Sequence, residues 1–147
     1  MKALSLRSLA IPFRTRFQHA AAERQVTQSL WAEAVTAQGK TGYGEGCPRD
    51  YVTGESLATA ESFFATVQPE LLDLSHLADL RRWVAAHRAL IDVNPAAWCA
   101  LELAALEAFA HEAGATVEQL LNLPPLAGPF HYSAVLGASD PATFQSQ

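Results

Sequence analysis

Four side chains near the start of the sequence, His19, Glu45, Cys47 and Asp50, are of the types that carry out nucleophilic and acid–base catalysis. A thiolate activated by a histidine is an effective nucleophile, so a Cys47–His19 pair would be reactive if the segment around His19 folded over Cys47. Nothing in the spacing requires that arrangement. Cys47 and Cys99 form no C-x-x-C motif, so neither a zinc site nor a redox motif is predicted, and both are expected to stay reduced.

The spacing of the ionisable residues in the long apolar segment at 96–113 favours structural roles for them. No second histidine follows His111-Glu112 at the spacing of an H-E-x-x-H zinc motif. A histidine near a helix C-terminus interacts favourably with the helix dipole. Glu102 and Glu107 would lie about 140° apart around a helix, which is poor geometry for a shared acid–base site. We therefore expect that the residues of this segment do not form an active site of their own.

The glycine-rich stretch Gly42-Tyr43-Gly44-Glu45-Gly46 resembles a phosphate-binding loop only in composition. A dinucleotide site needs a helix directly after the glycines, and a P-loop needs Lys-Ser/Thr there. The sequence continues with Cys47-Pro48-Arg49-Asp50 instead. The pattern favours a strand whose glycines allow close backbone packing over a nucleotide site.

Alternating apolar residues predict strands over residues 3–11, 26–37 and 41–47. Gly39-Lys40 supplies a turn between the second and third strands. Tight connections of this kind indicate an antiparallel meander. The segment 14–24 is longer than a hairpin turn needs, and long loops in compact domains are often functional, so we mark it as a candidate functional loop.

After Pro48 the spacing of apolar residues becomes helical and remains so until about Asn122. Thr53 is expected to cap a first helix that ends before Pro69, and Ser75 to cap a second. Further signals predict a helix over 96–113 that is opened by Asn94-Pro95 and closed by Gly114, and a short helix that begins with a capping box at Thr116-Val117-Glu118-Gln119. Strands followed by helices, without alternation, predict the α+β class.

Two features suggest that further polypeptide packs against this domain. The helix at 96–113 is apolar almost all round, so it must be buried on several sides. Near the end of the sequence, Phe130–Leu136 reads as a buried strand, and Ser139-Asp140-Pro141 reads as the start of a helix. A single βα unit cannot bury itself, so we expect its strand to pair with a following barrel or with another copy of the chain.

Composition and charge exclude several classes of protein. The chain of 147 residues is 50% hydrophobic and 17% charged, with a formal net charge of −5, which is typical of a globular domain. It has no basic stripe, so nucleic acid and anionic membranes are not expected partners. The N-terminus carries charge where a signal peptide is apolar, and no run is long enough to span a membrane. The cytoplasm is the expected location.

Four local phrases, in this order, resemble the N-terminal capping domain of the enolase superfamily, in its muconate-lactonizing and mandelate-racemase subgroup. The phrases are Ile11-Pro12-Phe13-Arg14, Gly42-Tyr43-Gly44-Glu45, Pro48-Arg49-Asp50-Tyr51-Val52-Thr53-Gly54-Glu55, and the stretch from Ala100-Leu101-Glu102 to Leu121-Asn122-Leu123-Pro124. The resemblance covers about residues 2–136. The phrase from Pro48 to Glu55 is most similar to dipeptide epimerases.

The resemblance implies a two-part enzyme. Residues 1–125 would form the capping domain, and residues 126–147 would form a linker and the first strand of a (β/α) barrel. In the family that barrel binds Mg²⁺ through three acidic ligands, carries a Lys-x-Lys strand end, and abstracts a proton next to a carboxylate. None of those barrel motifs occurs in this sequence. The resemblance therefore implies Mg²⁺ for the whole enzyme, with neither metal ligands nor catalytic residues in this chain.

The resemblance also implies that the domain contributes two loops that close over a small-molecule carboxylate substrate. The expected substrate-binding residues are Arg16, Phe17, Gln18 and His19 in the first loop and Arg49, Asp50, Tyr51 and Val52 in the second. Simple packing of Tyr51 and Val52 onto the first helix is an equally weighted alternative.

The implied function is the specificity cap of an epimerase or racemase of dipeptides or N-acyl amino acids. Alternatives are an o-succinylbenzoate synthase or cycloisomerase of the same superfamily, and a stand-alone binding module. The expected partners are the barrel domain, or a second polypeptide that carries it, and further copies of the chain in a homo-oligomer.

Overall fold

The computed structural model describes residues 1–19 and 22–132. Its sheet is an antiparallel meander of three strands in the order β1-β2-β3. The strands are β1 (Ala3–His19), β2 (Ala22–Val35) and β3 (Thr41–Gly46). Ala3 pairs with Val35, and Val35 with Thr41, so the three strands are in register at one end. The predicted meander and α+β class are confirmed.

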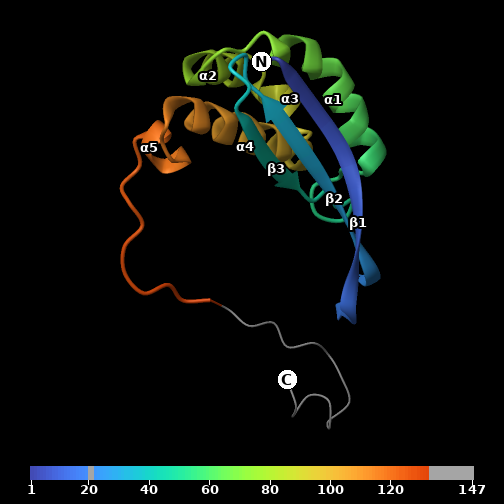
Figure 1. Ribbon diagram of the computed structural model, residues 1–147. Coiled ribbons are helices and arrows are strands. Elements are labelled where there is room, and N and C mark those ends of the chain that lie inside the picture. Colours follow the sequence, from blue (N-terminus) through green and yellow to red (C-terminus); the bar gives the residue numbers. More distant parts are fainter. Residues whose placement is uncertain (20–21, 133–147) are drawn as a thin grey trace.

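Within the segment 14–24, predicted as a loop, residues 17–19 are instead paired with residues 22–24. After an irregularity between Pro12 and Phe17, the ladder continues through Phe17↔Arg24, Gln18↔Glu23 and His19↔Ala22. The hairpin therefore extends past the helical layer, as Figure 1 shows at its lower right. Apolar alternation reports burial rather than backbone pairing, so a strand that leaves the core loses the sequence signal while it keeps its hydrogen bonds.

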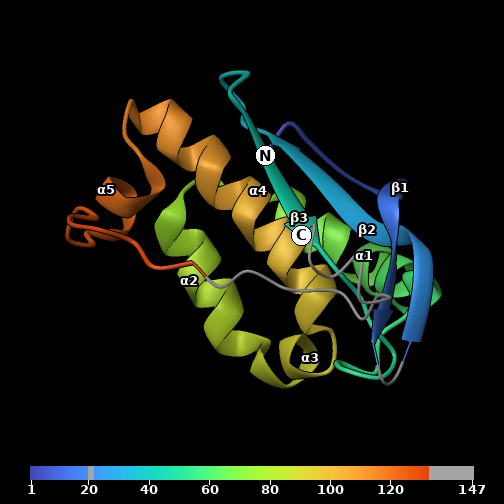
Figure 2. The same cartoon turned by 90° about the horizontal axis from the view of Figure 1, so that it is seen from below.

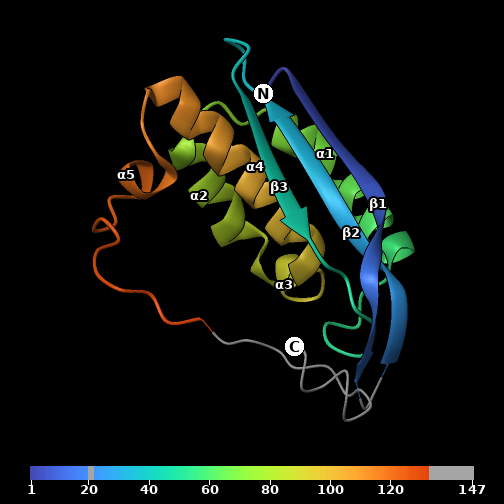
Figure 3. The ribbon, with the colours of Figure 1, turned by 60° about the horizontal axis from the view of Figure 1, so that its bottom comes forward.

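Helices cover one face of the sheet. They are α1 (Leu57–Leu72), α2 (Leu77–Ala86), α3 (Arg88–Asp92), α4 (Pro95–Ala113) and α5 (Val117–Leu121). Figure 3 shows the strands in front, with α4 behind β3 and α1 behind β1, and Figure 2 shows the helices gathered on one side of the sheet. The core lies between these layers and includes Leu30, Leu71 and Leu101.

Two predicted helix starts and one predicted end are wrong by a few residues. α1 is capped by Ser56, whose side chain accepts the Thr59 N–H, because the Thr53 hydroxyl is already bonded to the Arg49 carbonyl. α2 is capped by His76 rather than Ser75. α1 also continues through Pro69 to Leu72, since burying Leu71 outweighs the backbone hydrogen bond that proline lacks. The single-turn helix α3 was not predicted.

α4 begins and ends as predicted, with Pro95 in its first turn and Gly114 in the left-handed conformation at φ 65°. Most of its residues are buried, whereas Cys99 and Leu103 remain exposed. The capping box of α5 at Thr116 is also confirmed.

The glycines of β3 let the strand lie directly against α4. A Cβ atom built on Gly44 would lie 2.0 Å from the Ala100 carbonyl oxygen, and one on Gly46 would lie 2.1 Å from that of Ala96. Gly42 makes the same close approach to Ala104 and Ala108. The interpretation of this motif as a close-packing strand is confirmed, because no side chain fits between the two backbones.

Beyond α5 the chain leaves the domain as an extended segment (Figure 1). Phe130 and Tyr132, the start of the strand predicted at 130–136, are exposed and belong to no regular element. The remainder of that strand and the helix start at Ser139 lie outside the described residues.

Candidate functional site

The predicted substrate-binding residues fall on two neighbouring segments at one end of the sheet. Arg16, Phe17, Gln18 and His19 form the last part of β1, where the backbone register places them at the tip of the β1–β2 hairpin. The other four lie in the turn between β3 and α1. We call residues 49–55 the anchored turn.

Arg49 ties the anchored turn to β2. Its Nη1 donates to the Gln28 carbonyl at 2.8 Å and to the Pro48 carbonyl at 2.7 Å, and its Nη2 donates to the Thr27 hydroxyl at 3.0 Å. A guanidinium fork suits such multiple contacts because its donors are fixed in one plane. These bonds show that Arg49 supports the turn, whereas its predicted contact with substrate stays a prediction.

The middle of the anchored turn points outward. The Val52 and Thr53 N–H groups both donate to the Arg49 carbonyl, at 3.0 and 2.8 Å, which closes the turn. Asp50 Oδ1 accepts the Tyr51 N–H at 2.9 Å. Tyr51 is 46% exposed and Val52 is 70% exposed. On this hydrogen-bonded frame, Val52 is therefore mostly exposed and Tyr51 about half exposed.

Glu55 fixes the far end of the anchored turn. Only 2% of Glu55 is exposed, and its carboxylate accepts the N–H groups of Ala96 and Ala97 at 2.8 and 3.0 Å. A helix N-terminus leaves such groups without partners inside the helix and carries a partial positive charge, so a carboxylate stabilises it. Sequence reasoning missed this role, because Glu55 is 41 positions from Ala96.

A cavity of about 410 Å³ lies beside the anchored turn. Its lining contains both polar and apolar residues and consists of Gln28, Pro48, Arg49, Asp50, Glu55, Ser56, Leu57 and Ala58. Arg49 and Asp50 are the predicted site residues that reach it. Their opposite charges would suit a polar or zwitterionic group better than a hydrocarbon.

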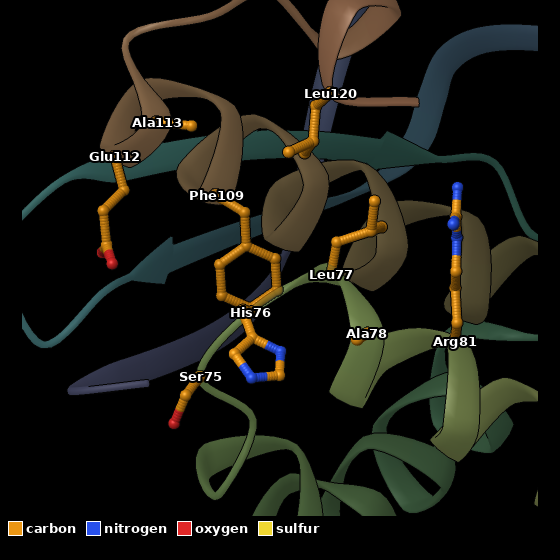
Figure 4. Close-up of a pocket in the computed structure, with 9 residues that line it drawn as sticks. All are labelled: Ser75, His76, Leu77, Ala78, Arg81, Phe109, Glu112, Ala113 and Leu120. Atoms are coloured by element: carbon orange, nitrogen blue, oxygen red, sulfur yellow. The ribbon is translucent and has the colours of Figure 1, made fainter. Parts of the chain in front are cut away.

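A larger cavity, of about 550 Å³, is drawn in close-up in Figure 4. It is lined by the start of α2, the end of α4 and α5, with Phe109 and Leu77 as its apolar part and His76, Arg81 and Glu112 around it. Ser75 in its lining adjoins Leu74, whose carbonyl accepts the amino group of Met1, whereas the hairpin tip is at the far end of β1. This cavity contains none of the predicted site residues.

The Cys47–His19 pair is excluded by the register of the sheet. Gly46, next to Cys47, pairs with Leu30, whereas His19 pairs with Ala22. Eight residues of β2 separate these points, about 26 Å at the rise of a strand, which is far beyond the reach of the two side chains. The contacts of Cys47 in the described residues are Ser29 Oγ at 3.4 Å and Glu45 Oε1 at 4.0 Å.

Structural roles are found for the ionisable residues of α4. Glu107 Oε2 accepts the Tyr43 N–H at 2.5 Å, and His111 Nδ1 lies 2.7 Å from the Thr41 carbonyl. Both contacts cover the edge of β3 that faces away from β2. Burial raises the pKa of the Glu102 carboxyl, and a hydrogen bond from the Trp98 side chain opposes that rise.

The described residues form neither a metal-binding cluster nor a membrane-spanning helix. Residues 1–19 and 22–132 contain no cluster of three or more His, Cys, Asp or Glu side chains that could hold a metal ion. In the same part of the chain, every helix is too short or too polar to cross a membrane.

No family model matches this sequence, and no curated protein matches it. Solved structures do match. A dipeptide epimerase from Cytophaga hutchinsonii, complexed with Mg and the dipeptide D-Ala-L-Val, superposes with a TM-score of 0.83 at 20% identity, over 97% of this chain and 38% of that chain. The N-succinyl Arg/Lys racemase from Bacillus cereus matches with a TM-score of 0.68 at 25% identity, over 97% and 38%.

A mandelate racemase/muconate lactonizing protein from Herpetosiphon aurantiacus matches with a TM-score of 0.62 at 25% identity, over 76% of this chain and 31% of that chain. This chain thus spans about a third of the length of the structures that it matches. Its fold is the α+β fold of an enolase-superfamily N-terminal domain, as the sequence resemblance predicted. Within that superfamily, it resembles dipeptide epimerases and the mandelate racemase/muconate lactonizing proteins.

Proposed function

We propose that this chain is the substrate-specificity cap of a racemase or epimerase that acts on dipeptides or N-acyl amino acids. The whole enzyme would remove a proton next to a carboxylate, using a barrel that lies outside this chain. In this proposal the hairpin tip and the anchored turn face the substrate side chains and exclude water from them. Domain boundaries near residue 125, the barrel partner, self-association and a cytoplasmic location belong to the same proposal.

The observation that carries the proposal is the geometry of the anchored turn. Tyr51 and Val52 are exposed, yet the backbone under them is held at both ends, by Arg49 on β2 and by Glu55 on α4. Large apolar side chains in solvent on a rigid frame are typical of contact surfaces, because little conformational entropy is lost when they bind. A turn that served only to join β3 to α1 would not need one buried and one half-buried anchor.

The chemistry of such a cap is selection rather than catalysis. Mg²⁺ bound in the barrel would stabilise the enolate that forms when the proton is removed. The described residues contain no group of three or more His, Cys, Asp or Glu side chains that could hold that ion. In this proposal the cap binds, orients and shields the substrate. Contacts with the substrate side chain change kcat/KM between substrates, typically by ~1–3 kcal/mol for each apolar group gained or lost.

The test uses the full-length enzyme that contains this chain. Val52→Ala and Tyr51→Ala should change the ranking of a panel of dipeptides and N-acyl amino acids by kcat/KM, with Mg²⁺ affinity unchanged. The matched control is Val93→Ala, which alters another exposed valine, at the C-cap of α3. It should leave the ranking of substrates unchanged. If Mg²⁺ affinity fell as much as turnover, the turn would belong to the metal site and the proposal would be wrong. Activity on o-succinylbenzoate precursors or lactones alone would contradict the proposed substrate class.

A further inference from the structure

Arg49 lies where the β2–β3 ladder stops. In β3, Tyr43 directs its backbone N–H away from β2 toward Glu107. The backbone N–H and C=O groups of the alternate residues Gly42, Gly44 and Gly46 therefore point toward β2. The last pair is Gly46↔Leu30. Continuing that register by two residues brings Pro48 opposite Gln28. Proline has no N–H, so Pro48 cannot donate the next ladder bond to the Gln28 carbonyl.

The Arg49 side chain supplies the donor that Pro48 lacks. Nη1 lies 2.8 Å from the Gln28 carbonyl and 2.7 Å from the Pro48 carbonyl, and so bridges β2 and the segment that follows β3. Nη2 adds a bond to the Thr27 hydroxyl on the same strand at 3.0 Å. The guanidinium therefore acts as one more rung of the ladder, made by a side chain instead of a backbone group.

This rung lies at the boundary between the core and the projecting hairpin. Ser29 and Leu30 are buried at 1% and 0% exposure, whereas Val26 is 40% exposed. Thr27 and Gln28 stand between them, so the bonds of Arg49 are made at the point where β2 leaves the core. The main-chain carbonyl of the same arginine closes the turn by accepting from Val52 and Thr53. One residue thus connects the base of the hairpin with the frame under Tyr51 and Val52.

We propose that Arg49 is a positioning residue, which locks the β1–β2 hairpin and the Asp50–Val52 tip into one surface by replacing the ladder bond that Pro48 removes. Arg49 then acts on selectivity through the geometry of the two segments rather than by touching the substrate. The positioning itself is independent of any reaction, and only its effect on substrates rests on the proposed function.

The first measurement needs no substrate. In the full-length protein, Arg49→Met should speed hydrogen exchange of the Val52 and Thr53 amides by roughly tenfold, which corresponds to loss of about one net hydrogen bond. Arg88→Met, which removes an exposed arginine on α3, is the matched control and should change neither amide. Unchanged exchange in Arg49→Met would overturn the proposal.

A second-site change separates positioning from substrate contact. Pro48→Ala restores a backbone N–H opposite Gln28, so the double variant Pro48→Ala/Arg49→Met should bring exchange back to within about threefold of the parent protein. A lost contact with substrate could not be repaired in this way. Failure of Pro48→Ala to slow the exchange of the Arg49→Met protein would contradict the replacement of the ladder bond.

The kinetic measurement then links the two proposals. Arg49→Met should shift the kcat/KM ratio of two dipeptides that differ in one side chain by about fivefold or more, and Pro48→Ala should reverse most of that shift. If exchange responds as expected and the ratio does not move, Arg49 still positions the turn and the proposed selectivity role of the turn is wrong. If the ratio moves and Pro48→Ala rescues exchange but not the ratio, Arg49 touches the substrate and the present inference is wrong.

Discussion

Glu55 and Ala96 join the anchored turn to the N-terminus of α4, with Glu55 Oε2 accepting the Ala96 N–H at 2.8 Å. The other oxygen of the same carboxylate accepts the Ala97 N–H at 3.0 Å. Asn94, the residue at the N-cap position, makes no capping bond of its own, because its side-chain amide donates to the Leu90 carbonyl. A distant glutamate has therefore taken over the capping of the central helix.

Glu55→Ala should lower the free energy of unfolding by about 2–3 kcal/mol, because two buried N–H groups lose their acceptor. Glu55→Gln keeps one acceptor oxygen and should cost less. Urea unfolding of the chain measures both. Glu61→Ala removes an exposed carboxylate from α1 and is the control, expected to stay within about 0.5 kcal/mol. Equal costs for Glu55→Ala and Glu61→Ala would contradict the capping role.

Gly44→Ala should destabilise the domain by about 3 kcal/mol or more, because the added methyl group would lie 2.0 Å from the Ala100 carbonyl oxygen and 2.7 Å from the Ala104 nitrogen. Both of these atoms belong to the backbone. Adding Ala104→Gly should therefore give no rescue, since it removes a side chain that is not in the way. Glu45→Ala, a change at the next position of β3 on its exposed face, is the control for altering the strand itself. Thermal unfolding ranks the variants.

Glu102→Gln should stabilise the domain at neutral pH and not at low pH. Burial raises the pKa of Glu102 in the folded state, so the folded protein holds this proton more tightly than the unfolded chain does. The stability cost of ionising Glu102 is then absent below the unfolded-state pKa of about 4.3, and it grows as pH rises through the raised folded-state pKa.

The gain from Glu102→Gln should be below about 1 kcal/mol, because water still screens this half-buried group. Melting temperatures of the two proteins at pH 7 and at pH 3.5 make the comparison, and the low-pH pair serves as the internal control. A Glu102→Gln protein that gains as much at pH 3.5 as at pH 7 would show that packing, not ionisation, is responsible.

The isolated 147-residue chain should bind Mg²⁺ at no specific site and should show no Mg²⁺-dependent epimerisation. Mg²⁺ sites need several oxygen ligands in near-octahedral geometry, and the described residues bring no three carboxylates together. Calorimetric titration is the direct measurement, with melting temperature in EDTA and in excess Mg²⁺ as a second reading. Micromolar affinity would place a metal ligand set in this chain and would contradict the proposed division of labour between cap and barrel.

Local signals in the sequence determined much of the fold. The helix α4 runs from Pro95 to Ala113 as predicted, because proline at the first turn and glycine in the left-handed conformation act within one turn of the backbone they affect. The alternation of apolar residues likewise predicted a strand in the region of β2, in which Leu30, Ala32 and Ala34 are buried. Such signals depend on residues within a few positions of each other, so one sequence is enough to interpret them.

Tertiary structure decided how the candidate site is built. The hairpin tip is paired because β1 and β2 continue to bond to each other beyond the core, where side-chain alternation carries no signal. Glu55 caps a helix that starts about forty residues later, and Arg49 bonds to Thr27 and Gln28, which lie more than twenty residues earlier. The sequence named Arg49–Val52 through resemblance, but the two anchors that hold this turn are made by partners distant in the chain, and only folding brings those partners within hydrogen-bond distance.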